Sequence, residues 1–315
     1  MDTLKFTYYL ISKFFLAAIL IFSASSLFSQ TISKEELTFL TSAWKGERFA
    51  DGRPKLPDEI IERAKKIGIE EAWTVLNNEG YRNQFEGNWK MVHDDVPVVG
   101  RAVTAMFMPT RPDVEKNIKD RGAKMGRIGN TNAWPIDGLV KGDVYVADAF
   151  GKIKGGTLIG DNLGTSIFNK TGTGVIFDGA ARDLEGLSKI KGFNAFVRDF
   201  HPSFLEEAVL MGLNTPIRIG GAMVLPGDLV ISEKEGVLFI PAHLAELVVS
   251  TAEFIGLKDT FGHEMLKSGR YSTGQIDSQW SDVIKSDFLK WLKAHPEERQ
   301  MTAAQLDEVM KKRTW

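Results

Sequence analysis

Two short polar segments of this sequence have the residue types and positions that ligand binding requires. The first is a glycine-rich segment, residues 155–164, which precedes an expected helix over residues 165–170. Backbone N–H groups at the start of a helix can bind a carboxylate or a phosphate. Asp161 or Asn162 could instead serve only as the N-cap of that helix, which is the simpler interpretation of the segment taken alone. The segment matches neither a Walker loop nor the dinucleotide fingerprint Gly-x-Gly-x-x-Gly.

The second segment is the dipeptide Arg182-Asp183, which follows an expected buried strand over residues 174–178. Folds in which strands and helices alternate bind ligands beyond the carboxyl ends of their strands. An Arg-Asp pair is also common as a helix cap with a surface charge beside it. Taken alone, the dipeptide is therefore a weak indication of a ligand site.

The surrounding sequence predicts strands that alternate with helices. Helices are expected within residues 33–78, where Ser33 begins a capping-box-like pattern and Pro57-Asp58-Glu59 opens a second helix. Two further helices are expected over residues 113–124 and 242–255. Apolar runs predict strands over residues 98–105, 143–148, 174–178, 193–197, 229–231 and 236–241. This alternation predicts an α/β fold.

Four parts are expected along the chain. Residues 1–29 read as a signal peptide, and residues 30–95 as a helical N-terminal segment. Residues 96–256 hold the α/β core with both polar segments, and residues 257–315 form a polar, helical C-terminal extension. The extension is expected to pack on its own domain or on a neighbouring subunit.

Composition limits the classes of function. The 315 residues include 39 Lys and Arg against 41 Asp and Glu, which gives a net charge of −2. A balance this close to neutral gives no electrostatic reason to expect a nucleic-acid partner. The chain has no cysteine, which excludes disulfides, thiolate catalysis, iron–sulfur clusters and thiolate zinc sites within it.

The N-terminal residues are typical of an export signal. Lys5 and Lys13 precede an apolar run over residues 14–22, and small residues follow at 23–26. A basic start, a short apolar core and small residues together indicate a secretory signal peptide. The alternative is an uncleaved membrane anchor, but the run is shorter than the roughly 20 residues needed to cross a bilayer. We therefore expect an exported chain, periplasmic or secreted, without a stable membrane anchor.

Considered together, the two polar segments point to one family. Asp161 is followed after 20 residues by Arg182-Asp183, and this spacing resembles the signature of the RraA-like proteins, which include regulators of ribonuclease E activity and class II aldolases acting on 4-hydroxy-4-methyl-2-oxoglutarate. The resemblance covers roughly residues 56–255. Further matching motifs are Gly100-Arg101-Ala102-Val103-Thr104, Gly142-Asp143-Val144, Gly174-Val175-Ile176-Phe177-Asp178-Gly179, Gly220-Gly221, Pro226-Gly227-Asp228 and Glu235-Gly236-Val237.

The resemblance implies a role for each residue of the two segments. The segment Gly160, Asp161, Asn162 and Leu163 resembles the one whose backbone amides bind the pyruvyl carboxylate, and Arg182 matches the substrate-binding arginine. Asp183 matches the direct ligand of a divalent cation, Mg²⁺ or Mn²⁺, which is otherwise held mainly by waters. Asp161 matches the acid that orients a metal-bound water for proton transfer, so Asp161 and Arg182 are the expected catalytic pair.

Two positions depart from the pattern of the family. Some aldolases of the family carry a further acid three residues after the metal ligand, where this chain has Gly186 with Glu185 just before it. The acidic turn before the last strand reads Glu233-Lys234-Glu235 here. These glutamates could support the site from a distance or from a neighbouring subunit, although a solvated charged turn is the simpler interpretation.

The expected function is that of a divalent-metal-dependent carbon–carbon lyase that cleaves a 4-hydroxy-2-oxo acid to pyruvate. The same site could decarboxylate oxaloacetate, because that reaction also gives the enolate of pyruvate. The alternative is a non-catalytic regulatory or binding protein, against which an export signal counts because ribonuclease E is intracellular. The resemblance also implies a homo-oligomer, a trimer or a hexamer.

Overall fold

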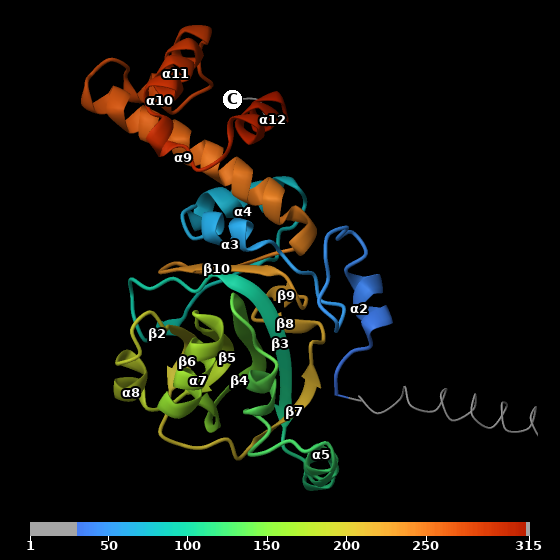
Figure 1. Ribbon diagram of the computed structural model, residues 1–315. Coiled ribbons are helices and arrows are strands. Elements are labelled where there is room, and N and C mark those ends of the chain that lie inside the picture. Colours follow the sequence, from blue (N-terminus) through green and yellow to red (C-terminus); the bar gives the residue numbers. More distant parts are fainter. Residues whose placement is uncertain (1–29, 313–315) are drawn as a thin grey trace, which may run out of the picture.

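The computed structural model describes residues 30–312, and its centre is a nine-stranded mixed sheet with helices around it (Figure 1). The predicted signal peptide, residues 1–29, lies outside the described residues. No helix of the described part of the chain has the length and apolar character needed to span a membrane.

The sheet order is β1-β11-β10-β3-β4-β5-β6-β2, and β7 pairs with β3 beside this path. The central strands β3, β4, β5 and β6 are parallel neighbours, whereas the outer pairs are antiparallel. A separate hairpin is formed by β8 and β9. The strands are β1 Phe85–Glu86, β2 Lys90–Met91, β3 Gly100–Pro109, β4 Asp143–Ile159, β5 Val175–Ala181, β6 Ala195–Phe200, β7 Ala208–Leu213, β8 Ile217–Ile219, β9 Ala222–Val224, β10 Leu229–Glu233 and β11 Gly236–Ile240.

The helices lie around this curled sheet, and the last of them extend beyond one end of it (Figure 1). The α-helices are α2 Lys34–Leu40, α3 Asp58–Ala64, α4 Ile69–Asn78, α5 Pro112–Lys124, α6 Trp134–Asp137, α7 Asp161–Thr171, α8 Leu184–Ser188, α9 Ala245–Lys267, α10 Thr273–Ile276, α11 Asp282–Ala294 and α12 Ala303–Lys312. Two short 3₁₀ helices are η1 Ala242–Leu244 and η2 Pro296–Glu298. As the sequence predicts, Ser33 caps α2, since its Oγ accepts a hydrogen bond from Glu36 N at 3.1 Å.

The predicted α/β fold is confirmed. Parallel strands covered on both faces should be apolar throughout, and all seven residues of β5 are buried. Alternate side chains of β5 enter two different clusters: Val175 and Phe177 pack towards α7 and α8, whereas Ile176 packs towards the hairpin of β8 and β9. A third cluster joins β10 and β11 to α3, α4 and α9.

The largest difference from the predicted elements concerns the glycine-rich segment. Strand β4 runs over 17 residues from Asp143 to Ile159, well beyond the expected 143–148, so residues 155–159 of this segment are strand and residues 161–164 already belong to α7. The strand bends at Phe150 and Gly151, which have positive φ angles of 45° and 67°, and its register against β5 shifts after Asp148. The bend lets one strand continue to the edge where α7 begins. The short strands β1, β2, β7, β8 and β9 were not predicted.

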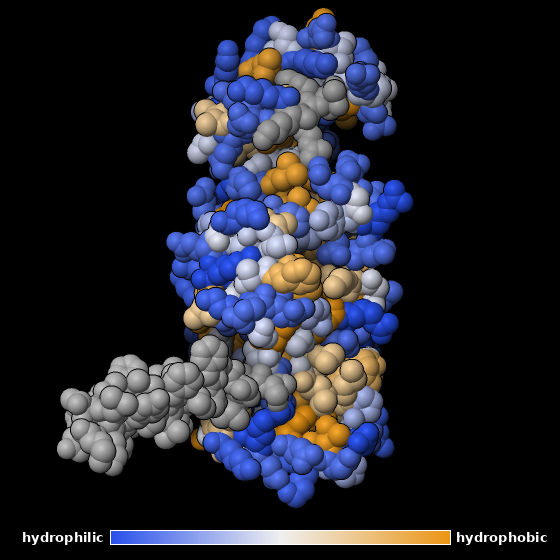
Figure 2. Space-filling view, turned by 90° about the vertical axis from the view of Figure 1, so that its right-hand side faces the viewer, coloured by the Kyte–Doolittle hydropathy of each residue, from blue (hydrophilic) through white to orange (hydrophobic). Residues whose placement is uncertain are grey.

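The C-terminal helices form a lobe of their own at one end of the elongated molecule (Figure 2). Helix α9 crosses α3 and α4 and then extends beyond them to carry α10, α11 and α12 (Figure 1). The lobe has a separate apolar cluster built around Phe254, Phe261, Trp280, Phe288 and Trp291. Helix α12 folds back along α9, where Gln305 Nε2 donates a hydrogen bond to Oε1 of Glu246 at 3.2 Å, and the lobe does not cover α7 or α8 (Figure 1).

Candidate active site

A small pocket lies where β4 and β5 end and α7 and α8 begin. Its volume is about 180 Å³. Ile159 closes β4, and its carbonyl oxygen accepts a hydrogen bond from Arg182 N at 2.9 Å, which holds the ends of the two strands together. The lining residues are Asn130, Asn132, Thr157, Leu158, Ile159, Gly160, Asp161, Asn162, Leu163, Arg182, Phe204 and Leu205.

The pocket gathers most of the residues that the sequence singles out. Gly160, Asp161, Asn162, Leu163 and Arg182 all line it. Asp183 is not among the lining residues, but its Oδ2 lies 3.6 Å from Nε of the neighbouring Arg182. The fold thus brings the two distant polar segments to the same edge of the sheet.

Helix α7 begins without a side-chain cap. Its N-cap is Gly160, and Asp161 is the first helical residue rather than the cap. The Oδ1 atom of Asp161 accepts a hydrogen bond from Asn162 N at 2.8 Å. Because glycine has no side chain to accept from the first turn, N–H groups there are open to an anion in the pocket.

Asp183 holds a backbone conformation that is rare for a residue with a side chain. Its φ and ψ are 57° and 45°, and it is the N-cap residue of α8. This left-handed region costs energy for most residues, although aspartate tolerates it better than most. The carbonyl oxygen of Asp183 accepts a hydrogen bond from Leu187 N at 2.9 Å, which anchors it to α8. Such conformations concentrate at functional sites.

Two glycines give the site its close packing. A Cβ atom on Gly160 would collide with Oδ2 of Asp183. A Cβ atom on Gly186 would lie 2.6 Å from Cβ and 2.7 Å from Oδ2 of Asp161. The position where some relatives of this family carry a further acid therefore has no room for a side chain beside Asp161 in this chain.

The guanidinium of Arg182 is half-exposed and stacked on an aromatic ring. Its Cζ lies 4.7 Å from the centroid of the Phe204 ring. The side chains of Arg182 and Asp183 are 35% and 38% exposed, so solvent and a ligand can reach both. A planar guanidinium suits a carboxylate because it can donate two parallel hydrogen bonds.

Sequence reasoning missed four residues of the pocket: Asn130, Asn132, Phe204 and Leu205. Asn132 Nδ2 donates to the Leu158 carbonyl at 2.5 Å, and Asn130 Nδ2 donates to the Leu205 carbonyl at 3.2 Å. These residues come from two loops remote in sequence from the predicted segments. No local spacing signals them, because only the sheet order brings the loops to β4.

The donor set fits a hard divalent cation held by few protein ligands. Within residues 30–312 no group of three or more histidine, aspartate or glutamate side chains could enclose a metal ion. In the part of the chain that the structure describes, Asp183 pairs with Arg182 alone, so its carboxylate retains lone pairs for a ligand. One carboxylate completed by waters is an arrangement that Mg²⁺ accepts, because it keeps much of its hydration.

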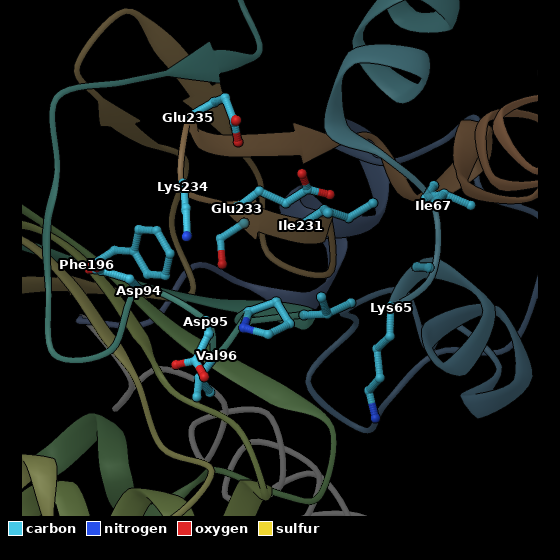
Figure 3. A pocket seen from close by; sticks show the side chains of 14 residues that line it. Lys65, Ile67, Asp94, Asp95, Val96, Phe196, Ile231, Glu233, Lys234 and Glu235 are labelled. Atoms are coloured by element: carbon cyan, nitrogen blue, oxygen red, sulfur yellow. The ribbon is translucent and has the colours of Figure 1, made fainter. Parts of the chain in front are cut away.

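The acidic turn lies elsewhere. Glu233, Lys234 and Glu235 line a different cavity of about 330 Å³, together with Asp94 and Asp95 (Figure 3). Burial raises the pKa of Glu233, and the charges of nearby glutamates add to this effect. This cavity shares no lining residue with the pocket at α7, so within one chain the turn does not support that pocket.

The fold and the pocket define a class: a mixed α/β protein with a small polar pocket at the carboxyl edge of its parallel strands. The family described as "RraA-like: Aldolase/RraA" matches residues 59–239. The chain belongs to the RraA-like family, and the predicted resemblance is confirmed.

Relatives in sequence include proteins named as aldolases. A protein of Halalkalibacterium halodurans, provisionally named 4-hydroxy-4-methyl-2-oxoglutarate aldolase, is 33% identical over 118 residues; the match covers 36% of this chain and about half, 52%, of that relative. A protein of Thermus thermophilus named 4-hydroxy-4-methyl-2-oxoglutarate aldolase is 27% identical over 139 residues, which cover 41% of this chain and 83% of the relative.

Solved structures share the fold. RraAS2 of Streptomyces coelicolor, described as an unusual member of the RNase ES inhibitor RraA protein family, is 24% identical with a TM-score of 0.58; the match covers 67% of this chain and 99% of that one. An uncharacterized protein of Pseudomonas syringae is 20% identical with a TM-score of 0.60, covering 74% of this chain and 98% of that one. At these identities the likeness concerns the fold alone.

Proposed function

We propose that this protein is a divalent-metal-dependent lyase that cleaves a 4-hydroxy-2-oxo acid to pyruvate and an aldehyde or ketone. One observation carries the proposal: the uncapped first turn of α7 and the guanidinium of Arg182 face one small pocket, with the carboxylate of Asp183 beside them. The names of the two aldolase relatives support the same reaction class.

Each residue of the pocket would have a separate role in the reaction. N–H groups of Gly160, Asp161 and Leu163 and the guanidinium of Arg182 bind the carboxylate and the 2-oxo group of the substrate, because the N–H of Asn162 already donates to Asp161 Oδ1. Asp183 would hold Mg²⁺ or Mn²⁺, which when bound would supply positive charge for the enolate that forms. Asp161 receives the proton of the 4-hydroxyl group through a water, since its carboxylate is half-exposed at the pocket wall.

Cleavage of the C3–C4 bond leaves its electron pair on the pyruvate fragment. When the 4-hydroxyl proton leaves, a carbonyl forms at C4 and the C3–C4 bond breaks. The electron pair of that bond passes to the 2-oxo acid fragment, which becomes the enolate of pyruvate. Arg182 stabilises this negative charge, and a proton returned to C3 completes pyruvate. Decarboxylation of oxaloacetate would give the same enolate, so we propose it as a side activity.

We propose that the active unit is a homo-oligomer, a trimer or a hexamer, as the family resemblance implies. Arg182 and Asp183 are more than a third exposed in the single chain, whereas an enolate needs protection from water. A neighbouring subunit could provide the missing wall. Light scattering would determine the number of subunits, and a monomer with full activity would contradict the proposal.

We also propose that the mature chain is exported, on the basis of the signal-like pattern in residues 1–29. N-terminal sequencing of the protein from its native cells is expected to begin between about residues 24 and 31. Recovery of an intact Met1 in the cytosolic fraction would contradict export.

The decisive experiment couples pyruvate release to lactate dehydrogenase over a panel of 4-hydroxy-2-oxo acids and oxaloacetate. EDTA should abolish release, and Mg²⁺ or Mn²⁺ should restore it. Full activity of the metal-stripped protein would contradict metal dependence. Release from none of the acids would contradict the lyase and favour the non-catalytic regulatory role.

A further inference from the structure

Phe204 is the most unusual residue of the pocket. It lines the cavity, yet the residue is 60% exposed. Its ring lies over the guanidinium of Arg182, with 4.7 Å between Cζ and the ring centroid. The ring therefore contacts the proposed substrate-binding cation rather than the apolar core.

The loop that carries Phe204 is fixed by hydrogen bonds on the residue before it. Ser203 Oγ accepts from Gly155 N at 2.8 Å, and the Ser203 carbonyl accepts from Thr157 Oγ1. Ser203 N donates to Nδ1 of His201 at 3.1 Å. Because these bonds tie the loop to β4, the position of the Phe204 ring over Arg182 is built into the fold.

The ring restricts how Arg182 can bind an anion. A guanidinium attracts an aromatic ring at its flat face and a carboxylate at its N–H edges. Since Phe204 covers one face of Arg182, the edges remain for the carboxylate of the substrate. The exposed part of the ring then lies beside whatever extends from that carboxylate.

The charged side chains of the pocket favour a substrate that carries one carboxylate over a substrate that carries two. Among the described residues that line it, Arg182 is the one cation, and Asp161 is an anion. Once Arg182 has bound the first carboxylate, a second one would meet Phe204, Leu163 and the negative charge of Asp161. Such a carboxylate would find no second cationic side chain among the described residues that line the pocket, and it would be repelled by the carboxylate of Asp161.

The size of the pocket sets a second limit. Its volume of about 180 Å³ lies below the roughly 300–1,000 Å³ typical of pockets for drug-sized ligands. A short tail is therefore favoured over a long one.

From these contacts we infer that Phe204 determines specificity: among 4-hydroxy-2-oxo acids the site favours those whose substituent on C4 is short and uncharged, and oxaloacetate, whose second carboxylate is C4 itself, is expected to be a slow substrate. The inference rests on the proposed lyase function and narrows its substrate class. It also separates this chain from its named relatives, because 4-hydroxy-4-methyl-2-oxoglutarate carries a second carboxylate.

The test uses two substrates of equal carbon number and the mature native protein with Mg²⁺. Cleavage of 4-hydroxy-2-oxopentanoate gives acetaldehyde, and cleavage of 4-hydroxy-2-oxoglutarate gives glyoxylate; both give pyruvate. We expect kcat/KM for the uncharged tail to be higher by about tenfold or more. Phe204→Ala should reduce this ratio mainly through a higher KM for the uncharged substrate, whereas Phe204→Tyr should preserve it.

The matched control is Phe39→Ala, because Phe39 is another exposed phenylalanine, 70% exposed, that does not line this pocket. It should leave the ratio unchanged. Equal or preferred cleavage of the dicarboxylate by the native protein would overturn the inference while leaving the lyase intact. An unchanged ratio in Phe204→Ala would overturn it as well.

A binding measurement tests the role of Phe204 independently of catalysis. Calorimetry compares 2-oxopentanoate with 2-oxoglutarate, which again differ only in the charge of the tail end. We expect tighter binding of 2-oxopentanoate, with the difference reduced in Phe204→Ala. If no pyruvate is released from any substrate, the lyase proposal fails; equal, reversed or absent binding of this pair is what overturns the role of Phe204.

Discussion

At the scale of single residues, the site is built from carboxylates that lie against glycines. Asp183 occupies the left-handed region with φ of 57° and packs against the bare backbone of Gly160. Asp161 packs in the same way against Gly186. Each acid is therefore held in place by contact with a glycine. Substitution of either acid or of its glycine should lower the catalytic rate more than it lowers the stability of the fold.

Asp183→Asn should reduce the rate of pyruvate release by about 100-fold or more, because the carboxylate is the proposed metal ligand. Asparagine tolerates the left-handed region as well as aspartate does, so the melting temperature should change little. Calorimetry with Mg²⁺ should show that binding is lost. The matched control is Glu185→Gln, since Glu185 is an exposed acid two residues away that pairs with Lys189. Mg²⁺ binding retained by Asp183→Asn would refute the assignment.

Gly186→Ala should displace Asp161, because the new Cβ would lie 2.6 Å from Cβ of that residue. We expect kcat/KM to fall by about tenfold or more, in line with the cost of misplacing a reacting group. Gly256→Ala is the control, since Gly256 lies within α9 and has no atom within 4 Å of the added methyl group. That exchange should raise stability by about 0.5–1 kcal/mol. Unchanged kinetics in Gly186→Ala would show that Asp161 has no positional role.

At the scale of elements, a buried ion cluster ties the N-terminal segment to the starts of β3 and β4. Asp143 is fully buried, and its carboxylate lies 3.4 Å from Nη1 of Arg53 and 3.3 Å from Nε of Arg101. Both arginine side chains are 4% exposed. Arg101 Nη1 also pairs with Asp58 at 3.0 Å, which reaches α3. The cluster therefore sets the position of the strands that end at the pocket.

Asp143→Asn should lower the free energy of unfolding by about 3–5 kcal/mol, because it leaves two buried arginines without their shared carboxylate. Chemical denaturation measures the change. Asp120→Asn is the control, since Asp120 forms an exposed pair with Lys116 on one face of α5. Such surface pairs contribute about 0–1 kcal/mol. Equal effects of the two exchanges would mean that the buried cluster adds no stability beyond a surface pair.

The turn before β10 should make stability depend on pH. Burial raises the pKa of Asp228 to about 7, although a hydrogen bond from Leu225 N, 2.8 Å from Oδ2, opposes this shift. In the unfolded chain the pKa is about 3.9. The folded state therefore binds the proton more tightly, and this contribution is complete below about pH 4 and is lost as pH rises towards about 7.

The measurement is the free energy of unfolding of the native protein minus that of Asp228→Asn, followed from pH 4 to 8. Because asparagine does not titrate, the difference should fall by about 1.4 kcal/mol per pH unit below the folded pKa. It should level off above about pH 7. A difference that stays flat over this range would show that Asp228 remains ionised when buried.

At the scale of the whole molecule, the C-terminal lobe lies far from α7 and α8 (Figure 1), and the pocket is at the start of α7. Phe288 is fully buried at the centre of the lobe, with ring centroids 5.4 Å from both Phe261 and Trp280. The lobe is joined to the rest of the chain through α9, which also packs on α3 and α4. Because the lobe has a separate apolar core, it can unfold while the sheet stays folded.

Phe288→Ala should destabilise the lobe by about 3–5 kcal/mol. Limited proteolysis should then cleave within residues 268–312, while pyruvate release per intact site stays within about twofold of the native rate, because the lobe contributes no residue to the pocket of its own chain. Loss of activity together with loss of the oligomer would instead show that the lobe forms the subunit interface.

The sequence by itself determined the α/β fold, the family and the positions, though not the full lengths, of the central strands. Continuous apolar runs such as residues 174–178 identify strands that are buried on both faces, because local composition directly reflects this burial. The spacing from Asp161 to Arg182 indicated the family because it spans one complete helix and strand. Short strands such as β8 and β9 have three residues each, too few for a periodic signal.

Only the tertiary structure decided which residues line the pocket. The order of β4, β5 and β6 in the sheet places Phe204 over Arg182 and brings Asn132 to β4, although these residues are far apart in sequence. It also separated the acidic turn at 233–235 from the pocket and moved the C-terminal lobe away from it. Contacts between distant loops depend on strand order and on bends such as that at Phe150, and neither leaves a local pattern in the sequence.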